Sequence, residues 1–94
     1  MTQTERITRM ESLFDKSEEV VRRLGQAIED FHALQPDMAE LEAYYDGPDW
    51  RADFEADEAG RLPKDLKRGV LSEDAVYNLL EDYNCLKDQI REVE

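Results

Sequence analysis

The chain has 94 residues, of which 38% are charged and 40% are hydrophobic, and its formal net charge is −12. This length allows one small domain, residues 1–94, with a thin core. The negative charge argues against binding to nucleic acid or to an anionic membrane, because both are polyanions. No apolar run approaches the roughly 20 residues that a membrane-spanning helix needs.

Two features bear on where the protein works. The first residues, Met-Thr-Gln-Thr-Glu-Arg, lack the apolar core of a secretory signal peptide. The one cysteine, Cys85, cannot form a disulfide within the chain. We therefore expect a cytoplasmic protein.

Apolar residues recur at heptad spacing through the N-terminal third of the chain. Polar Ser17 is the only interruption, and the apolar members define the N-terminal stripe: Ile7, Met10, Phe14, Val21, Leu24, Ile28 and Phe31. Such a pattern predicts one long helix with the apolar face of a coiled coil. Thr2 and Glu5 have the spacing of a capping box, and Pro36 disfavours continuation, so we predict this helix over residues 3–34.

Two short helices are predicted in the middle of the chain. The first covers residues 37–46, with Asp37 as its N-cap and the Asp46-Gly47-Pro48 sequence at its end. The second covers residues 49–59 and opens after Pro48. Trp50 and Phe54 are one turn apart and share a face.

A turn-rich segment, residues 61–69, precedes the last predicted helix, residues 73–93, which Ser72 is expected to cap. This helix carries a second stripe: Val76, Leu79, Tyr83, Leu86, Ile90 and Val93. No segment alternates with the period of a β-strand. The sequence therefore predicts an all-α protein, in which two long helices pack as a hairpin or bundle with two short helices between them.

The first long helix is longer than the last by more than two turns, so pairing them leaves part of the N-terminal stripe uncovered. Either the aromatic residues of the middle segment cover it, or a second copy of the chain does. The thin core favours a homodimer.

Charge is distributed unevenly. Residues 35–60 contain nine acidic residues and one basic residue, whereas residues 61–72 contain one acidic and four basic residues. The simplest interpretation is that the two blocks neutralise each other within the fold.

The residues show no catalytic constellation, so we expect neither an enzyme nor a cofactor. The Asp53-x-Glu55-x-Asp57 spacing resembles the start of a calcium-binding loop, but Glu58 stands where that loop needs glycine. Asp53, Glu55, Asp57 and Glu58 are therefore weak candidates for binding a divalent metal or a small ligand.

Several stretches resemble a known family. They are Glu5-Arg6-Ile7 with Met10-Glu11, Tyr44-Tyr45, Trp50-Arg51-x-Asp53-Phe54-Glu55-Ala56-Asp57-Glu58-Ala59-Gly60, Leu62-Pro63-x-Asp65-Leu66-Lys67-Arg68-Gly69-Val70-Leu71-Ser72-Glu73-Asp74, and Tyr77-x-Leu79-Leu80. They are similar to a family of small bacterial proteins known as domain of unknown function 4298. The resemblance implies a small helical bacterial protein and transfers no activity or site residues.

The stretches of this resemblance concentrate between residues 44 and 74, which we call the 44–74 surface. It is either a structural joint, in which acidic and basic residues pair, or a docking surface for an unidentified protein partner. Our interpretation is a non-enzymatic protein–protein interaction module, with a metal-binding or small-ligand protein and an acidic nucleic-acid mimic as alternatives. The candidate partner-binding residues are Tyr44, Tyr45, Trp50, Asp53, Phe54, Asp57, Arg61, Lys67 and Arg68.

Overall fold

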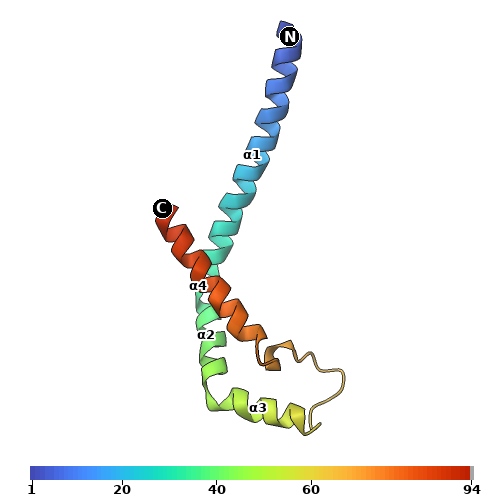
Figure 1. Ribbon diagram of the computed structural model, residues 1–94, viewed down its shortest axis with the longest axis vertical. Coiled ribbons are helices and arrows are strands. Elements are labelled where there is room, and N and C mark those ends of the chain that lie inside the picture. The colour runs from blue at the N-terminus through green and yellow to red at the C-terminus, as the bar shows by residue number, and fades with distance from the viewer. Residues whose placement is uncertain (94) are drawn as a thin grey trace. The chain divides into compact units, whose positions relative to one another are not determined.

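The structure, a computed structural model, describes the backbone of residues 1–93 and the side chains of residues 1–91. Within that range it is all-α, as predicted, with no strand (Figure 1). The elements are α1 (Gln3–Ala33), α2 (Gln35–Asp46), α3 (Pro48–Glu58), the short 3₁₀ helix η1 (Gly69–Leu71) and α4 (Ala75–Val93). None of these helices combines the length and the apolar character that a membrane crossing requires.

The chain divides into two compact units, Met1–Gln35 and Pro36–Glu94. The first unit contains α1, and the second contains the shorter helices and α4. The single domain and the hairpin of the two long helices stay predictions.

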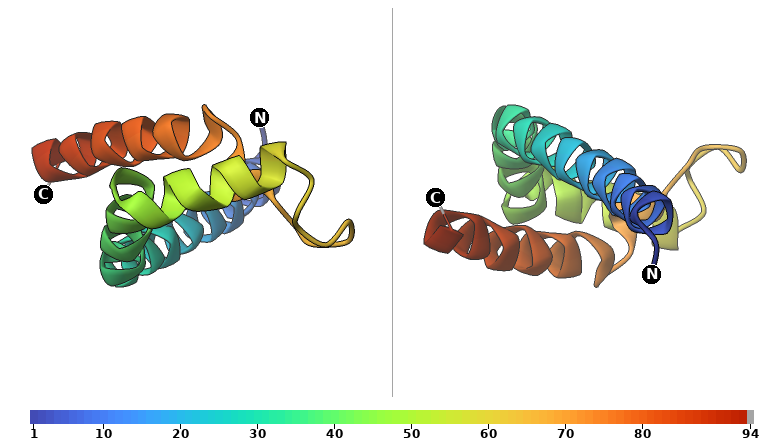
Figure 2. Two further views of the ribbon diagram at one scale, coloured as in Figure 1. Left: turned by 90° about the horizontal axis from the view of Figure 1, so that it is seen from below. Right: turned by 90° about the horizontal axis from the view of Figure 1, so that it is seen from above.

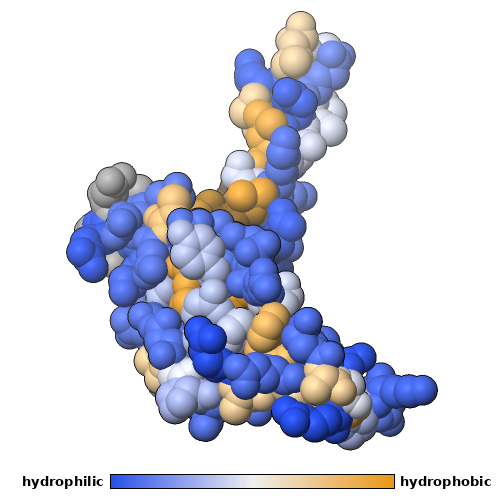
Figure 3. Space-filling model, turned by 60° about the horizontal axis from the view of Figure 1, so that its bottom comes forward, coloured by the Kyte–Doolittle hydropathy of each residue, from blue (hydrophilic) through white to orange (hydrophobic). Residues whose placement is uncertain are grey.

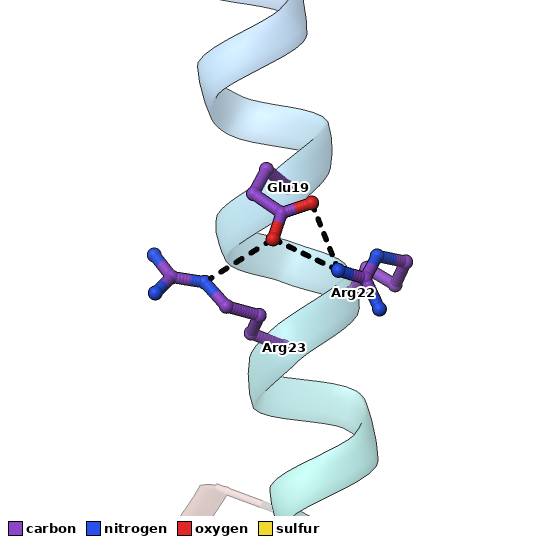
Figure 4. Close-up of polar contacts among 3 residues, drawn as sticks. All are labelled: Glu19, Arg22 and Arg23. Atoms are coloured by element: carbon purple, nitrogen blue, oxygen red, sulfur yellow. Dashed lines mark hydrogen bonds and ion pairs between the residues drawn. The ribbon is translucent and has the colours of Figure 1, made fainter.

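Helix α1 matches the predicted long helix to within one residue. Thr2 is its N-cap, and the Thr2 hydroxyl accepts a hydrogen bond from the Glu5 backbone N–H at 3.2 Å. Its 31 residues span about 46 Å. On its polar side Glu19 lies between Arg22 and Arg23, at 2.8 and 3.6 Å (Figure 4). These pairs are exposed and stabilise the helix only slightly.

Helix α2 begins at Gln35, two residues before the predicted start, so Asp37 as N-cap is wrong. Pro36 falls in the first turn, where a missing N–H costs no helical hydrogen bond. Asp37 lies in that first turn as well, where its charge favours the helix N-terminus.

A sharp corner at Gly47 separates α2 from α3 (Figure 1). A Cβ atom at Gly47 would lie 2.9 Å from the Ala43 carbonyl oxygen, so only glycine fits this corner without a shift of the backbone. Pro48 is the first residue of α3, one residue before the predicted start at residue 49, and α3 ends at Glu58, one residue before the predicted end.

Helix α3 ends in a Schellman motif. Gly60 has φ of +70°, the Gly60 N–H bonds to the Asp57 carbonyl and the Arg61 N–H bonds to the Ala56 carbonyl. The turns that follow carry the chain to η1 and then into α4 (Figure 2).

Helix α4 begins at Ala75, two residues after the predicted start, and Ser72 as its N-cap is wrong. Ser72 closes η1 instead, because its N–H bonds to the Gly69 carbonyl at 3.2 Å and its backbone is extended. The Asp74 carbonyl accepts the hydrogen bond from the Asn78 N–H.

The buried hydrophobic residues among the described side chains lie in the second unit: Met38, Leu71, Val76 and Tyr83. The 3₁₀ helix η1 packs against both α3 and α4, so buried Leu71 lies on an element that joins the two helices. Part of the second stripe stays open, with Leu79 and Leu86 exposed. The predicted stripe member Val93 lies outside the described side chains.

Candidate functional site

Three aromatic side chains form a cluster where α2 turns into α3. The Trp50 and Phe54 rings stack with centroids 5.1 Å apart and planes at 17°. The Tyr45 ring meets Trp50 edge-on, with centroids 5.3 Å apart. The predicted shared face of Trp50 and Phe54 is confirmed, and the ring distances are those of favourable aromatic pairs.

Two long-range hydrogen bonds fix this cluster. Trp50 Nε1–H donates to the Val70 carbonyl at 2.9 Å, and the Tyr45 hydroxyl donates to the Glu73 carbonyl at 3.3 Å. These bonds connect α2 and α3 to the segment that contains η1 and precedes α4. Tyr45 and Trp50 are therefore held by their polar ends, and Phe54 stacks on Trp50. All three side chains remain only half-buried.

An open pocket of about 390 Å³ lies against the cluster. Among the described residues, neither carboxylate that lines it takes part in an ion pair or a side-chain hydrogen bond. We call it the aromatic pocket, and its lining is Tyr45, Trp50, Arg51, Phe54, Glu55 and Glu73.

A second group of candidate residues lies around a smaller hollow of about 240 Å³. The Tyr44 hydroxyl donates to Asp53 Oδ2 at 2.7 Å. Burial, the hydrogen bond to Asp53 and the negative charges of Asp53 and Asp49 raise the pKa of Tyr44 to about 12.

Asp57 and Arg68 form an ion pair beside this hollow. Arg68 Nη1 lies 2.8 Å from Asp57 Oδ1, and both side chains are largely covered. This pair joins the acidic block to the basic block, as the structural-joint interpretation expects.

The structure thus separates the predicted site residues into two sets. Tyr45, Trp50 and Phe54 line the aromatic pocket, while Tyr44, Asp53, Lys67 and Arg68 line the smaller hollow. Asp57 joins the second set through Arg68. Arg61 is exposed and lines neither pocket.

The predicted site omitted Arg51 and Glu73 and gave Glu55 only as a weak metal candidate. All three are charged residues of the 44–74 surface, and all three belong to the stretches that resemble the family. Arg51 and Glu55 lie on α3, next to Trp50 and Phe54. Glu73 is held beside the rings by the Tyr45–Glu73 hydrogen bond, which connects residues 28 positions apart.

The candidate metal ligands Asp53, Glu55, Asp57 and Glu58 are not brought together. Across the described residues no group of three or more His, Cys, Asp or Glu side chains has an arrangement that could hold a metal ion. Asp53 and Asp57 instead bind Tyr44 and Arg68.

The N-terminal stripe is a second candidate surface. No residue of α1 is buried. Phe14 and Leu24 are each 60% exposed and Val21 is 70% exposed. Apolar side chains are open to solvent along this helix (Figure 3). Apolar exposure of this kind on one helix face typically marks an interaction surface.

Comparison with known proteins gives a family and no closer relative. No curated protein and no solved structure matches the chain. The model of a family described as "Domain of unknown function (DUF4298)" matches residues 7–93. The match covers nearly the whole chain, both of its units and the entire 44–74 surface. The chain therefore belongs to the DUF4298 family.

Proposed function

We propose that this protein is a non-enzymatic protein–protein interaction module and that its docking face is the 44–74 surface. The observation that carries the proposal is the aromatic pocket, which stays open although the rings around it are fixed. Aromatic side chains are the residues most enriched at the centres of protein interfaces.

The fixed rings favour binding for an energetic reason. A partner that docks on mobile side chains must pay the entropy of ordering them, about 0.5–1.5 kcal/mol for each flexible side chain. Trp50 and Tyr45 are already held by the carbonyls of Val70 and Glu73. Ordering them therefore costs a partner little.

The internal contacts of the surface are compatible with this role. Asp57–Arg68 and Tyr44–Asp53 stabilise the joint on the side of the smaller hollow. The carboxylates of the aromatic pocket have no such partner among the described side chains. The structural joint thus supports the docking face by holding its elements in place.

Site-specific photocrosslinking in cells tests the proposal. A photoreactive amino acid at position 55 is expected to capture one discrete protein adduct, and the same group at position 58 serves as the matched control on the same helix. Glu58 is exposed and does not line the aromatic pocket. No adduct at position 55, or an identical set of adducts at both positions, would contradict the proposal.

A second copy of the chain is the partner that we propose for the N-terminal stripe. The stripe has a hollow whose lining includes the small side chain of Ser17 and the bulky side chain of Phe14. In an antiparallel pair of α1 helices, Phe14 of each copy enters the Ser17 hollow of the other, which is the reciprocal contact of a two-fold interface. We also propose a cytoplasmic, bacterial setting.

The acidic nucleic-acid mimic stays an alternative. In that case the adduct captured at position 55 would be a DNA-binding protein.

A further inference from the structure

We infer that the aromatic pocket binds the cationic side chain of a lysine or arginine in a basic segment of the partner protein. This inference rests on the proposed function and specifies the chemistry of the partner. It follows from the charges that line the pocket, from the aromatic rings and from the charge of the surrounding surface.

The charges around the pocket favour a cation. Glu55 and Glu73 line it, and neither is in an ion pair among the residues that the structure describes. Arg51 is the only base in residues 35–60, against nine acids. A basic segment therefore approaches a surface of complementary charge, which accelerates and orients docking.

The rings provide the second part of the recognition. A lysine or arginine cation is attracted to an aromatic face within about 6 Å of its centroid, and tryptophan is the best acceptor. Trp50, Phe54 and Tyr45 supply three rings with successive centroids 5.1 and 5.3 Å apart. A contact of this kind is present on α4, where Lys87 Nζ lies 5.6 Å from the Tyr83 centroid.

Arg51 lines the same pocket and acts against a cationic ligand. Its guanidinium offsets part of the negative charge of Glu55 and Glu73. Removing this charge therefore strengthens the binding of a cation, whereas removing either carboxylate weakens it. A general loss of structure would weaken binding in every variant. Stronger binding without the Arg51 charge, together with weaker binding without either carboxylate, therefore indicates that the pocket recognises charge.

Trp50 is the only tryptophan, so its fluorescence reports directly from the pocket. The full chain is titrated with amidated tetra-arginine, with tetra-glutamate as the anionic control. Tetra-arginine is expected to change Trp50 emission in a saturable way, and tetra-glutamate is expected to leave it unchanged.

Four variants then locate the binding. Glu55→Gln and Glu73→Gln are each expected to weaken tetra-arginine binding about two- to fivefold, and Arg51→Gln to strengthen it by a similar factor. Glu58→Gln, with the same loss of charge outside the pocket, leaves the affinity unchanged. Circular dichroism verifies that each variant is folded.

Two results would overturn the inference. They are an absence of any saturable Trp50 response, and an equal weakening by Glu58→Gln and Glu55→Gln, which would mean non-specific attraction. If position 55 still captures a discrete partner in cells, the proposed function survives and the cationic ligand is wrong. If both experiments fail, both proposals are wrong.

Discussion

Arg68 and Asp57 form the closest ionic contact between the basic and acidic blocks, at 2.8 Å, with side chains 36% and 27% exposed. Because solvent still screens such a pair, we expect a coupling free energy of about 0.5–1 kcal/mol. Urea unfolding of Asp57→Ala, Arg68→Ala and the double variant measures it. Exposed Lys67→Ala is the matched control and should change the free energy of unfolding little. Additive effects of the two single variants would show that the pair does not stabilise the joint.

The raised pKa of Tyr44 predicts how the stability of the fold changes at alkaline pH. Its pKa is raised from 10.0 to about 12, so the folded protein favours the neutral phenol that donates to Asp53. The stabilisation is fully present below pH 10 and is lost as the pH rises toward 12. Tyr44→Phe is therefore expected to lower the melting temperature at pH 8, and the difference from the unmodified chain should shrink between pH 10 and 12.

Tyr77→Phe serves as the comparison for this pH series. The pKa of Tyr77 is also raised, mainly by its hydrogen bond to Glu81, but Tyr77 is exposed on α4. Its replacement should lower the melting temperature less than that of Tyr44. A constant difference between Tyr44→Phe and the unmodified chain from pH 8 to 12 would contradict the assignment.

Among the helices, those whose ends depend on neighbouring residues in the sequence were predicted well from local sequence patterns. The heptad spacing and the Thr2 cap located α1, and Pro48 located the start of α3. The starts of α2 and α4 were each wrong by two residues, because Pro36 fits inside a first turn and Ser72 completes η1. Asp37 and Ser72 are both residues that often cap a helix. In the fold, Asp37 lies inside the first turn of α2 and Ser72 ends η1, and the sequence alone does not show these roles.

The candidate site was predictable only where its contacts are between residues close in sequence. One helical turn predicted the stacking of Trp50 and Phe54. The acceptors of Trp50 and Tyr45 are the backbone carbonyls of Val70 and Glu73. Every residue has a carbonyl, so no sequence pattern marks these partners, and the presence of Glu73 in the pocket lining could not be derived.

Gly25 in α1 leads to a prediction about the stability of that helix. Gly25 lies within the helix, and a Cβ atom there would meet nothing within 4 Å. Gly25→Ala is therefore expected to stabilise α1 by about 1 kcal/mol and to increase the helical circular-dichroism signal. Gly60→Ala is the contrasting variant, because its φ of +70° strains any other residue, and it should destabilise the chain. Destabilisation by Gly25→Ala would mean that another chain approaches α1 closely at that residue.

For the whole molecule, the net charge of −12 acts in opposite directions on the two proposed associations. Two copies that meet along the N-terminal stripe repel each other, and added salt screens this repulsion while the apolar contact remains. A basic segment in the aromatic pocket is attracted by the same charge, and added salt weakens that attraction. The direction of the salt effect therefore distinguishes the two surfaces.

Light scattering across a concentration series measures the first association. The mass is expected to rise from 11.0 kDa toward about twice that value with concentration, and to do so at lower concentration when salt is added. Phe14→Glu places a charge in the stripe and should keep the chain monomeric, whereas Ser12→Glu adds the same charge on the opposite helix face and should not. Tetra-arginine binding should weaken over the same range of salt. A constant 11.0 kDa at every concentration and salt level would show that the N-terminal stripe does not bind a second copy.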